Sequence, residues 1–156
     1  MPTPTLPDSL RGALVMAVDD SPPAREALRY AAKLAADCGR TLHVVHVWNF
    51  VTGPHPEQGG NTAPSEAAWQ AEAERRLAAL LVEELGEGAA VEQVVLHGNT
   101  TPVLLKVSEL ADHLVVGSRG RGGFAGLLLG STSEQLVRHA CCPITVVREG
   151  CTDKPA

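Results

Sequence analysis

Two patterns of apolar residues alternate along the chain. One is a short, nearly continuous apolar run, which is typical of a strand buried on both faces. Five such runs lie at residues 13–18, 41–48, 91–97, 113–117 and 144–148. The other pattern repeats apolar residues about every 3.6 positions, as amphipathic helices do. Four such segments lie at residues 22–38, 65–85, 102–111 and 131–140.

The ends of the helical segments carry matching signals. Ser21 is suited to cap the first helix, and two prolines follow it in the first turn, where a missing amide hydrogen costs nothing. Gly39 supplies the stop of the same helix. On the second helix, Glu72 and Arg76 are spaced for an exposed ion pair.

Regular alternation of strands and helices sets the expected fold. It predicts parallel strands joined by right-handed crossovers, so we expect an α/β fold with a single open five-stranded parallel sheet and helices on both faces. Residues 49–64 hold three prolines and three glycines without periodicity, which predicts a long loop. We expect one domain at residues 10–149, with flexible tails at 1–9 and 150–156.

Composition narrows the class of partner. The chain has 156 residues, of which only 3% are aromatic, so a base-stacking platform for single-stranded nucleic acid is not expected. The net charge of −5 argues against a protein that binds a nucleic-acid backbone. The four cysteines show no metal-binding spacing. The chain shows neither a signal peptide nor an apolar run of about 18 residues, so we expect a cytoplasmic protein that does not enter membranes.

Ligands of open parallel sheets bind beyond the carboxyl ends of the strands. The residues expected at that edge are Asp19 and Asp20 after the first strand, Val47 and Trp48 at the end of the second, residues 98–101 after the third, and Gly117 onward after the fourth. His97, at the end of the third strand, is better placed to approach a site there than the other histidines.

The glycine-rich segment 117–131 is the strongest chemical signal in the chain. Glycines let successive backbone amides turn toward one anion, and Gly130 and Ser131 open a helix, where orphan amides favour phosphate. A structural alternative stays open for Ser131, because Ser131 and Glu134 fit a Ser-x-x-Glu capping box.

Three common phosphate motifs fit less well. A Walker A loop requires a Gly-Lys pair that the chain lacks. The segment after the first strand is not a glycine-rich PP-loop. Residues 120–125 satisfy the dinucleotide fingerprint G-x-G-x-x-A, but they do not open the first strand–helix unit, as that fingerprint requires.

The same segment reproduces the G-2x-G-9x-G-S/T pattern of the ATP-binding subgroup of universal stress proteins, through Gly117, Gly120, Gly130 and Ser131. Residues 18–21 are similar to the family's V-D-x-S, residues 46–47 to its second-strand ending, and residues 142–147 to its C-P-V-x-V-V strand. The chain thus resembles that family over about residues 10–149. The resemblance implies an adenine nucleotide alpha-hydrolase-like fold, a Rossmann-like three-layer sandwich.

The resemblance also implies a nucleotide site. Asp19 would contact the adenine or ribose, Val47 would lie against the adenine, and Arg119 and Arg121 would neutralise part of a triphosphate. The full set of implied binding residues is Asp19, Val47, Val116, Gly117, Arg119, Gly120, Gly130, Ser131, Thr132 and Ser133. A local alternative for Asp19 is a favourable position beside a helix N-terminus. The cofactor would be ATP with Mg²⁺ or Mn²⁺ held through its phosphates.

By the same resemblance the partner would be a second copy, paired through the strand at 144–148. The alternative is that Arg148 and Glu149 protect the edge of a monomer. The implied function is ATP-dependent regulation in a stress response, with at most slow hydrolysis, since no paired base and nucleophile is evident. An ATPase or adenylate-transferring enzyme, or a scaffold without nucleotide, are the alternatives. We expect Trp48, next to Val47, to lie beside the adenine and to respond to ATP more than Trp69.

Overall fold

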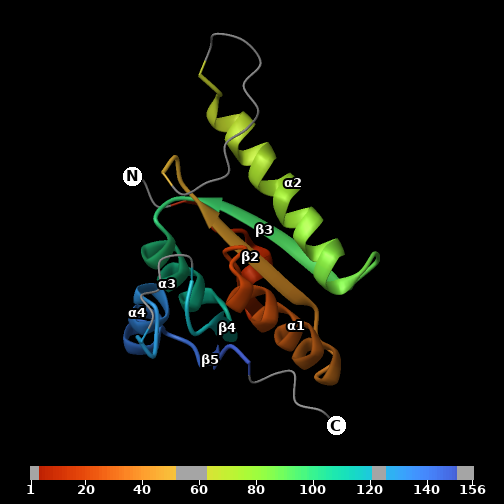
Figure 1. The fold of residues 1–156 in the computed structure, drawn as a ribbon, viewed down its shortest axis with the longest axis vertical. Helices are drawn as coiled ribbons and strands as arrows, with labels where there is room; N and C mark the ends of the chain where they lie inside the picture. Colours follow the sequence, from red (N-terminus) through yellow and green to blue (C-terminus); the bar gives the residue numbers. More distant parts are fainter. Residues whose placement is uncertain (1–3, 52–62, 121–125, 151–156) are drawn as a thin grey trace.

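The computed structural model describes residues 4–51, 63–120 and 126–150. Five strands form one parallel sheet in the order β3-β2-β1-β4-β5 (Figure 1). The strands are β1 Leu14–Ala17, β2 Leu42–Trp48, β3 Val91–His97, β4 His113–Gly117 and β5 Ile144–Val147. The helices are α1 Pro22–Asp37, α2 Glu66–Leu85, α3 Thr100–Leu110 and α4 Ser131–His139. The expected fold class, sheet and alternation of elements are confirmed.

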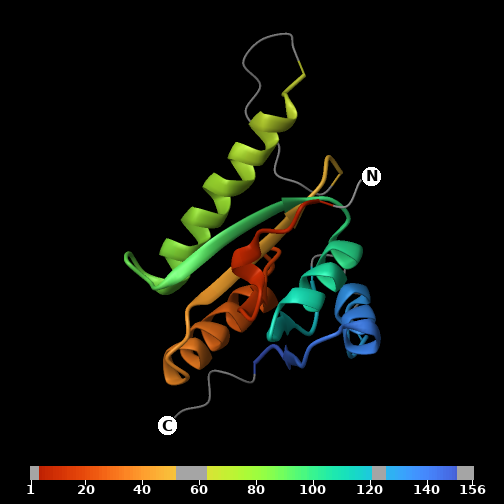
Figure 2. The same ribbon diagram turned by 180° about the vertical axis from the view of Figure 1, so that it is seen from behind.

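Helices cover both faces of the sheet, as Figures 1 and 2 show from opposite sides. Side chains alternate along each strand, so β1 sends Met16 to one face and Val15 to the other. The first face packs against α1 and α2 through residues such as Leu28 and Leu77. The second packs against α3 and α4 through residues such as Val107 and Leu136. The result is three layers with an aliphatic core.

Most helix ends lie where the sequence predicts them. Ser21 caps α1 through a 3.3 Å hydrogen bond from the amide of Ala24, and Gly39 follows the helix with a φ of 64°. Helix α3 begins at Thr100, two residues before the expected start at Pro102. The proline is tolerated inside the first turn because amide hydrogens there have no intrahelical acceptor. A short 3₁₀ helix at Asp8–Leu10, which the sequence pattern does not predict, buries Leu10 completely.

Several expectations fall on residues outside the described ranges. Most of the predicted loop at 49–64 and part of the glycine-rich segment, including Arg121, lie there. The division into a domain and two tails stays a prediction. Of the helices in the described ranges, none is both long enough and apolar enough to span a membrane.

Candidate functional site

A cavity of about 430 Å³ lies at the carboxyl ends of β1, β2 and β4, which is where ligands bind in this class of sheet. All ten residues implied as nucleotide contacts line it. The structure therefore brings together side chains from four separate segments, although their roles in binding stay a prediction. The cavity is also lined by residues outside that implied binding set: Ala17, Val18, Ala24, Val45, His46, Thr100, Leu104 and Leu127.

The cavity has an apolar part and a polar part. Val45, Val47, Leu104 and Val116 contribute aliphatic walls, whereas the glycine-rich segment and the first turn of α4 contribute backbone and hydroxyl groups. Leu104 belongs to the apolar periodicity of α3, so its sequence signal is indistinguishable from that of a core residue. This division suits a ligand with one flat apolar end and one anionic end.

Hydrogen bonds close the two ends of the glycine-rich segment. The amide of Gly130 donates to the carbonyl oxygen of Ser118 at 2.7 Å. The amide of Ser118 in turn donates to the carbonyl oxygen of Val147 at 2.9 Å. A Cβ placed on Gly130 would lie 3.3 Å from the Cα of Arg119 and 3.4 Å from the nitrogen of Gly120. Glycine is required at 130 by this close approach of two backbone segments, because its φ of −71° suits any residue.

The first turn of α4 differs from the capping box that Ser131 and Glu134 allow. Gly130 is the N-cap and Ser131 is the first helical residue, with no side-chain cap. Glu134 instead pairs with Arg138 at 2.9 Å, one turn along the helix. The capping alternative for Ser131 is therefore wrong, since a serine inside the helix is one position too late to act as the N-cap.

Ser133 lies one residue deeper in the same turn and is buried. Its hydroxyl donates to the carbonyl oxygen of Gly117 at 2.7 Å, which ties α4 to the end of β4. Since this bond uses the only hydroxyl hydrogen, the donor that Ser133 can offer to a phosphate is its backbone amide. The hydroxyl of Thr132 accepts a 3.2 Å hydrogen bond from that of Thr101 on α3.

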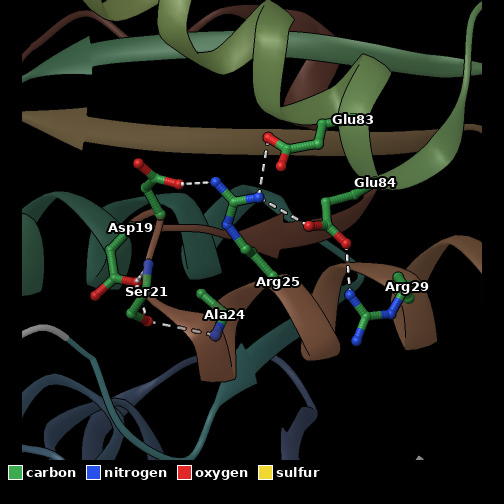
Figure 3. A network of polar contacts seen from close by, with 8 residues as sticks. Asp19, Ser21, Ala24, Arg25, Arg29, Glu83 and Glu84 are labelled. Carbon is green, nitrogen blue, oxygen red and sulfur yellow. Dashed lines mark hydrogen bonds and ion pairs between the residues drawn. The ribbon is translucent and has the colours of Figure 1, made fainter.

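Asp19 lies where β1 leads into α1 (Figure 3). Its Oδ1 accepts hydrogen bonds from the amide and the hydroxyl of Ser21, at 3.1 and 2.6 Å. A Cβ on Gly120 would lie 2.5 Å from Oδ2, so the absence of a side chain at 120 makes room for the carboxylate. Asp19 therefore both supports the start of α1 and lines the cavity.

Asp20 belongs to an ion-pair network that includes the labelled residues Arg25, Arg29, Glu83 and Glu84 of Figure 3. Its backbone has a φ of 65°, which is unusual for a residue with a side chain, and its carboxylate pairs with Arg25 at 2.8 Å. Arg25 also bonds Glu84 and Glu83 near the end of α2, and hydrogen bonds to these carboxylates raise the pKa of the Arg25 guanidinium. Arg29 joins Glu84 from the next turn of α1.

Trp48 and His97 do not line the cavity. Trp48 is 1% exposed and stacks on His97 with ring centroids 4.3 Å apart and on Trp69 at 6.0 Å. The expectation that Trp48 lies beside the ligand is therefore wrong, because side chains alternate along β2 and Trp48 takes the face opposite to Val47. The His97 ring is hydrogen-bonded to Glu66 at the start of α2, outside the cavity wall.

His46 lines the cavity, although it is outside the set of binding residues that the family resemblance implies. Its Nδ1 lies 2.9 Å from the carbonyl oxygen of Val18. Since a carbonyl oxygen only accepts, Nδ1 carries the hydrogen. Strand β2 also holds His43, which is buried and does not line the cavity, so a histidine within the strand does not by itself distinguish His46 from a core residue.

Comparison with known proteins identifies the family of the chain independently of these motifs. A profile described as the Universal stress protein family matches residues 12–148. The universal stress protein Rv1996 of Mycobacterium tuberculosis is 32% identical over 151 residues, which cover 87% of this chain and 48% of that protein. The chain spans about half the length of the curated relatives it matches.

Two solved structures share the fold. A universal stress protein from Archaeoglobus fulgidus in complex with dAMP is 24% identical, with a TM-score of 0.59 over 88% of this chain and 98% of that one. A family protein from Arabidopsis thaliana with AMP bound is 20% identical, with a TM-score of 0.59 over 92% of this chain and 97% of that one. The expected adenine nucleotide alpha-hydrolase-like arrangement is confirmed.

Proposed function

This chain belongs to the universal stress protein family, and on that premise we propose that it is a nucleotide-dependent regulatory protein of a stress response whose ligand is ATP. The observation that carries the proposal is the cavity at the carboxyl edge of the sheet. Its aliphatic walls suit an adenine ring, and the amides of the glycine-rich segment and of the α4 start suit phosphates. The names of two structural neighbours, which mention dAMP and AMP, support an adenine nucleotide.

In this proposal Val47 and Val116 enclose the base, while Asp19 accepts a hydrogen bond from the adenine amino group or the ribose. Gly117, Gly120 and residues 130–133 surround the sugar and phosphates, and Arg119 supplies a positive charge. A Mg²⁺ or Mn²⁺ ion would be held through the phosphates. In the described part of the chain, no group of three or more His, Cys, Asp and Glu residues is arranged to hold a metal.

We propose binding with at most slow hydrolysis. His46 is the one histidine on the cavity wall within the described residues, and its Nδ1 is engaged by the Val18 carbonyl. Asp19, the carboxylate on that wall, is engaged by Ser21. Ser21 is not among the described residues that line the cavity, so its hydroxyl is not placed to attack a bound phosphate, and fast phosphoryl transfer would require a base paired with such a nucleophile. An ATPase or adenylate-transferring enzyme therefore remains the alternative that phosphate-release assays distinguish.

We also propose a homodimer through residues 144–148. Strand β5 is at the edge of the sheet, and its Ile144 and Val146 are half-buried, so pairing with a second copy would cover them. Sedimentation would show dimers of the wild type and monomers of Val146→Glu. Val137→Glu, which adds the same charge at an exposed position of α4, is the control. A monomeric wild type would contradict the dimer. The cytoplasmic location stays a prediction.

The function is tested by mass spectrometry of nucleotide released from freshly purified protein, followed by calorimetric titration of stripped protein with AMP, ADP and ATP, with and without Mg²⁺. We expect saturable binding of one nucleotide per chain. Asp19→Asn keeps an oxygen toward Ser21 but replaces the other carboxylate oxygen by an amide, so it should weaken binding about tenfold. Asp112→Asn, an exposed acid paired with Arg40, is the matched control. Folded, stripped protein that binds none of the three nucleotides would refute the proposal.

A further inference from the structure

Arg119 is engaged by an acidic residue that no nucleotide motif contains. Its guanidinium lies 3.4 Å from the carboxylate of Glu149, which follows β5. The Arg119 side chain is 34% exposed and that of Glu149 is 50% exposed, so both are accessible to a ligand and to water. The pair joins the wall of the cavity to the segment that leaves the edge of the sheet.

The backbone next to each partner is held in place. Ser118, the neighbour of Arg119, donates its amide to the carbonyl of Val147 at 2.9 Å. Gly150, the neighbour of Glu149, donates its amide to the buried carboxylate of Glu26 on α1 at 2.9 Å. Because both chain segments are fixed, little backbone entropy is lost when the two charges meet, and the pair is favoured over an ordinary surface pair.

Arg119 is also the only arginine or lysine among the described residues that line the cavity. The amides at the start of α4 can hold one phosphate group without any side-chain charge. Each further phosphate adds negative charge that only a cation can offset strongly. Recognition of a diphosphate or triphosphate therefore depends on Arg119 more than recognition of a monophosphate does.

We infer that Glu149 is a specificity-determining residue that lowers the preference of the cavity for nucleoside triphosphate over monophosphate, because it competes with the outer phosphates for Arg119. This inference rests on the proposed nucleotide function. A monophosphate leaves the Arg119–Glu149 pair intact. A triphosphate replaces Glu149 at the guanidinium, and the displaced carboxylate returns to water.

The test is calorimetric titration of the full chain with AMP and ATP at fixed ionic strength, for four proteins: wild type, Glu149→Gln, Arg119→Gln and the double variant. Glu149→Gln should raise the ratio of ATP to AMP affinity about threefold, the size expected for release of an exposed ion pair. In the Arg119→Gln background the same change should leave the ratio unaltered. Glu109→Gln, an exposed acid of α3 paired with Lys106, removes the same charge away from the cavity and is the control.

The outcomes distinguish a failure of the role inferred for Glu149 from a failure of the proposed nucleotide function. If wild type binds both nucleotides and Glu149→Gln leaves their affinity ratio unchanged, the inference is refuted and the nucleotide function stands. A rise in the ratio that persists without Arg119 also refutes it, because the effect is then one of net charge. Failure of the wild type to bind either nucleotide overturns both.

Discussion

The amide of Gly130 and the carbonyl oxygen of Ser118 form a 2.7 Å hydrogen bond across the base of the glycine-rich segment. This bond places the start of α4 directly against the end of β4. A side chain on Gly130 would enter the gap, where the Cα of Arg119 and the nitrogen of Gly120 lie within 3.4 Å of its Cβ. The shape of the anionic part of the cavity thus depends on two backbone segments in contact.

Gly130→Val should abolish this contact and weaken nucleotide affinity at least tenfold, because the two γ-methyl groups have no space between the segments. Calorimetric titration with ATP measures the affinity, and thermal unfolding shows that the fold persists. Ala36→Val, at an exposed position of α1, is the control for an added valine. Full affinity in a folded Gly130→Val protein would contradict the placement of phosphates at this contact.

Ser133→Ala should lower stability, whereas Ser131→Ala should lower nucleotide affinity. The first removes the hydrogen bond to the buried Gly117 and leaves its carbonyl without that donor, so the free energy of unfolding should fall by about 1–2 kcal/mol. The second removes an exposed hydroxyl at the start of α4, so stability should stay within about 0.5 kcal/mol while ATP affinity falls. Urea unfolding and calorimetry separate the two. A Ser133→Ala protein as stable as the wild type would show that the Ser133 bond contributes nothing.

Much of the fold was predictable because each strand and helix carries its own periodicity. The motif positions from Asp19 to Ser133 were predictable as one site, since the carboxyl ends of parallel strands share an edge. Trp48 was misplaced because adjacency to Val47 in a strand means opposite faces, and the sequence does not say which face holds the ligand. Glu149 was beyond prediction as a partner of Arg119, because 30 residues separate them and only the folded sheet brings them together.

Cys142 should be alkylated more slowly than Cys38 and Cys141. Burial raises the pKa of the Cys142 thiol, so less of the reactive thiolate is present at pH 7.5, whereas Cys38 and Cys141 are exposed. Iodoacetamide treatment of native protein with peptide mass spectrometry gives the order of modification. Treatment of urea-unfolded protein is the control, in which the rates should become similar. If Cys142 is modified first in the native protein, burial does not suppress the reactivity of its thiol.

Glu72 should contribute to stability in neutral but not in strongly acidic solution. Hydrogen bonds from Arg75 and Arg76 lower the pKa of Glu72 from 4.5 to about 2. The folded state therefore holds the carboxylate more readily than the unfolded state, and the contribution is complete above pH 4.5 and lost as the pH falls toward 2. The Arg75 and Arg76 side chains are exposed, so water screens their attraction to Glu72 and we expect a contribution of about 0.5 kcal/mol.

Urea unfolding of wild type and Glu72→Gln at pH 7 and pH 3 measures this contribution. The difference in unfolding free energy between the two proteins should shrink at the lower pH. Glu87→Gln, which removes an exposed acid just beyond α2, controls for net charge. A difference of the same size at both pH values would mean that the arginines do not act on Glu72.

The proposed function requires that an adenine nucleotide occupies the cavity at the carboxyl edge of the sheet. The most direct test is a titration of ¹⁵N-labelled, nucleotide-free protein with ATP and Mg²⁺, followed by amide and indole chemical shifts. We predict saturable shifts of Gly117, Gly120 and residues 130–133, and unchanged indole signals of Trp48 and Trp69, whose rings lie away from the cavity. Saturable shifts confined to other residues, or no saturable shift at all, would contradict nucleotide binding in this cavity.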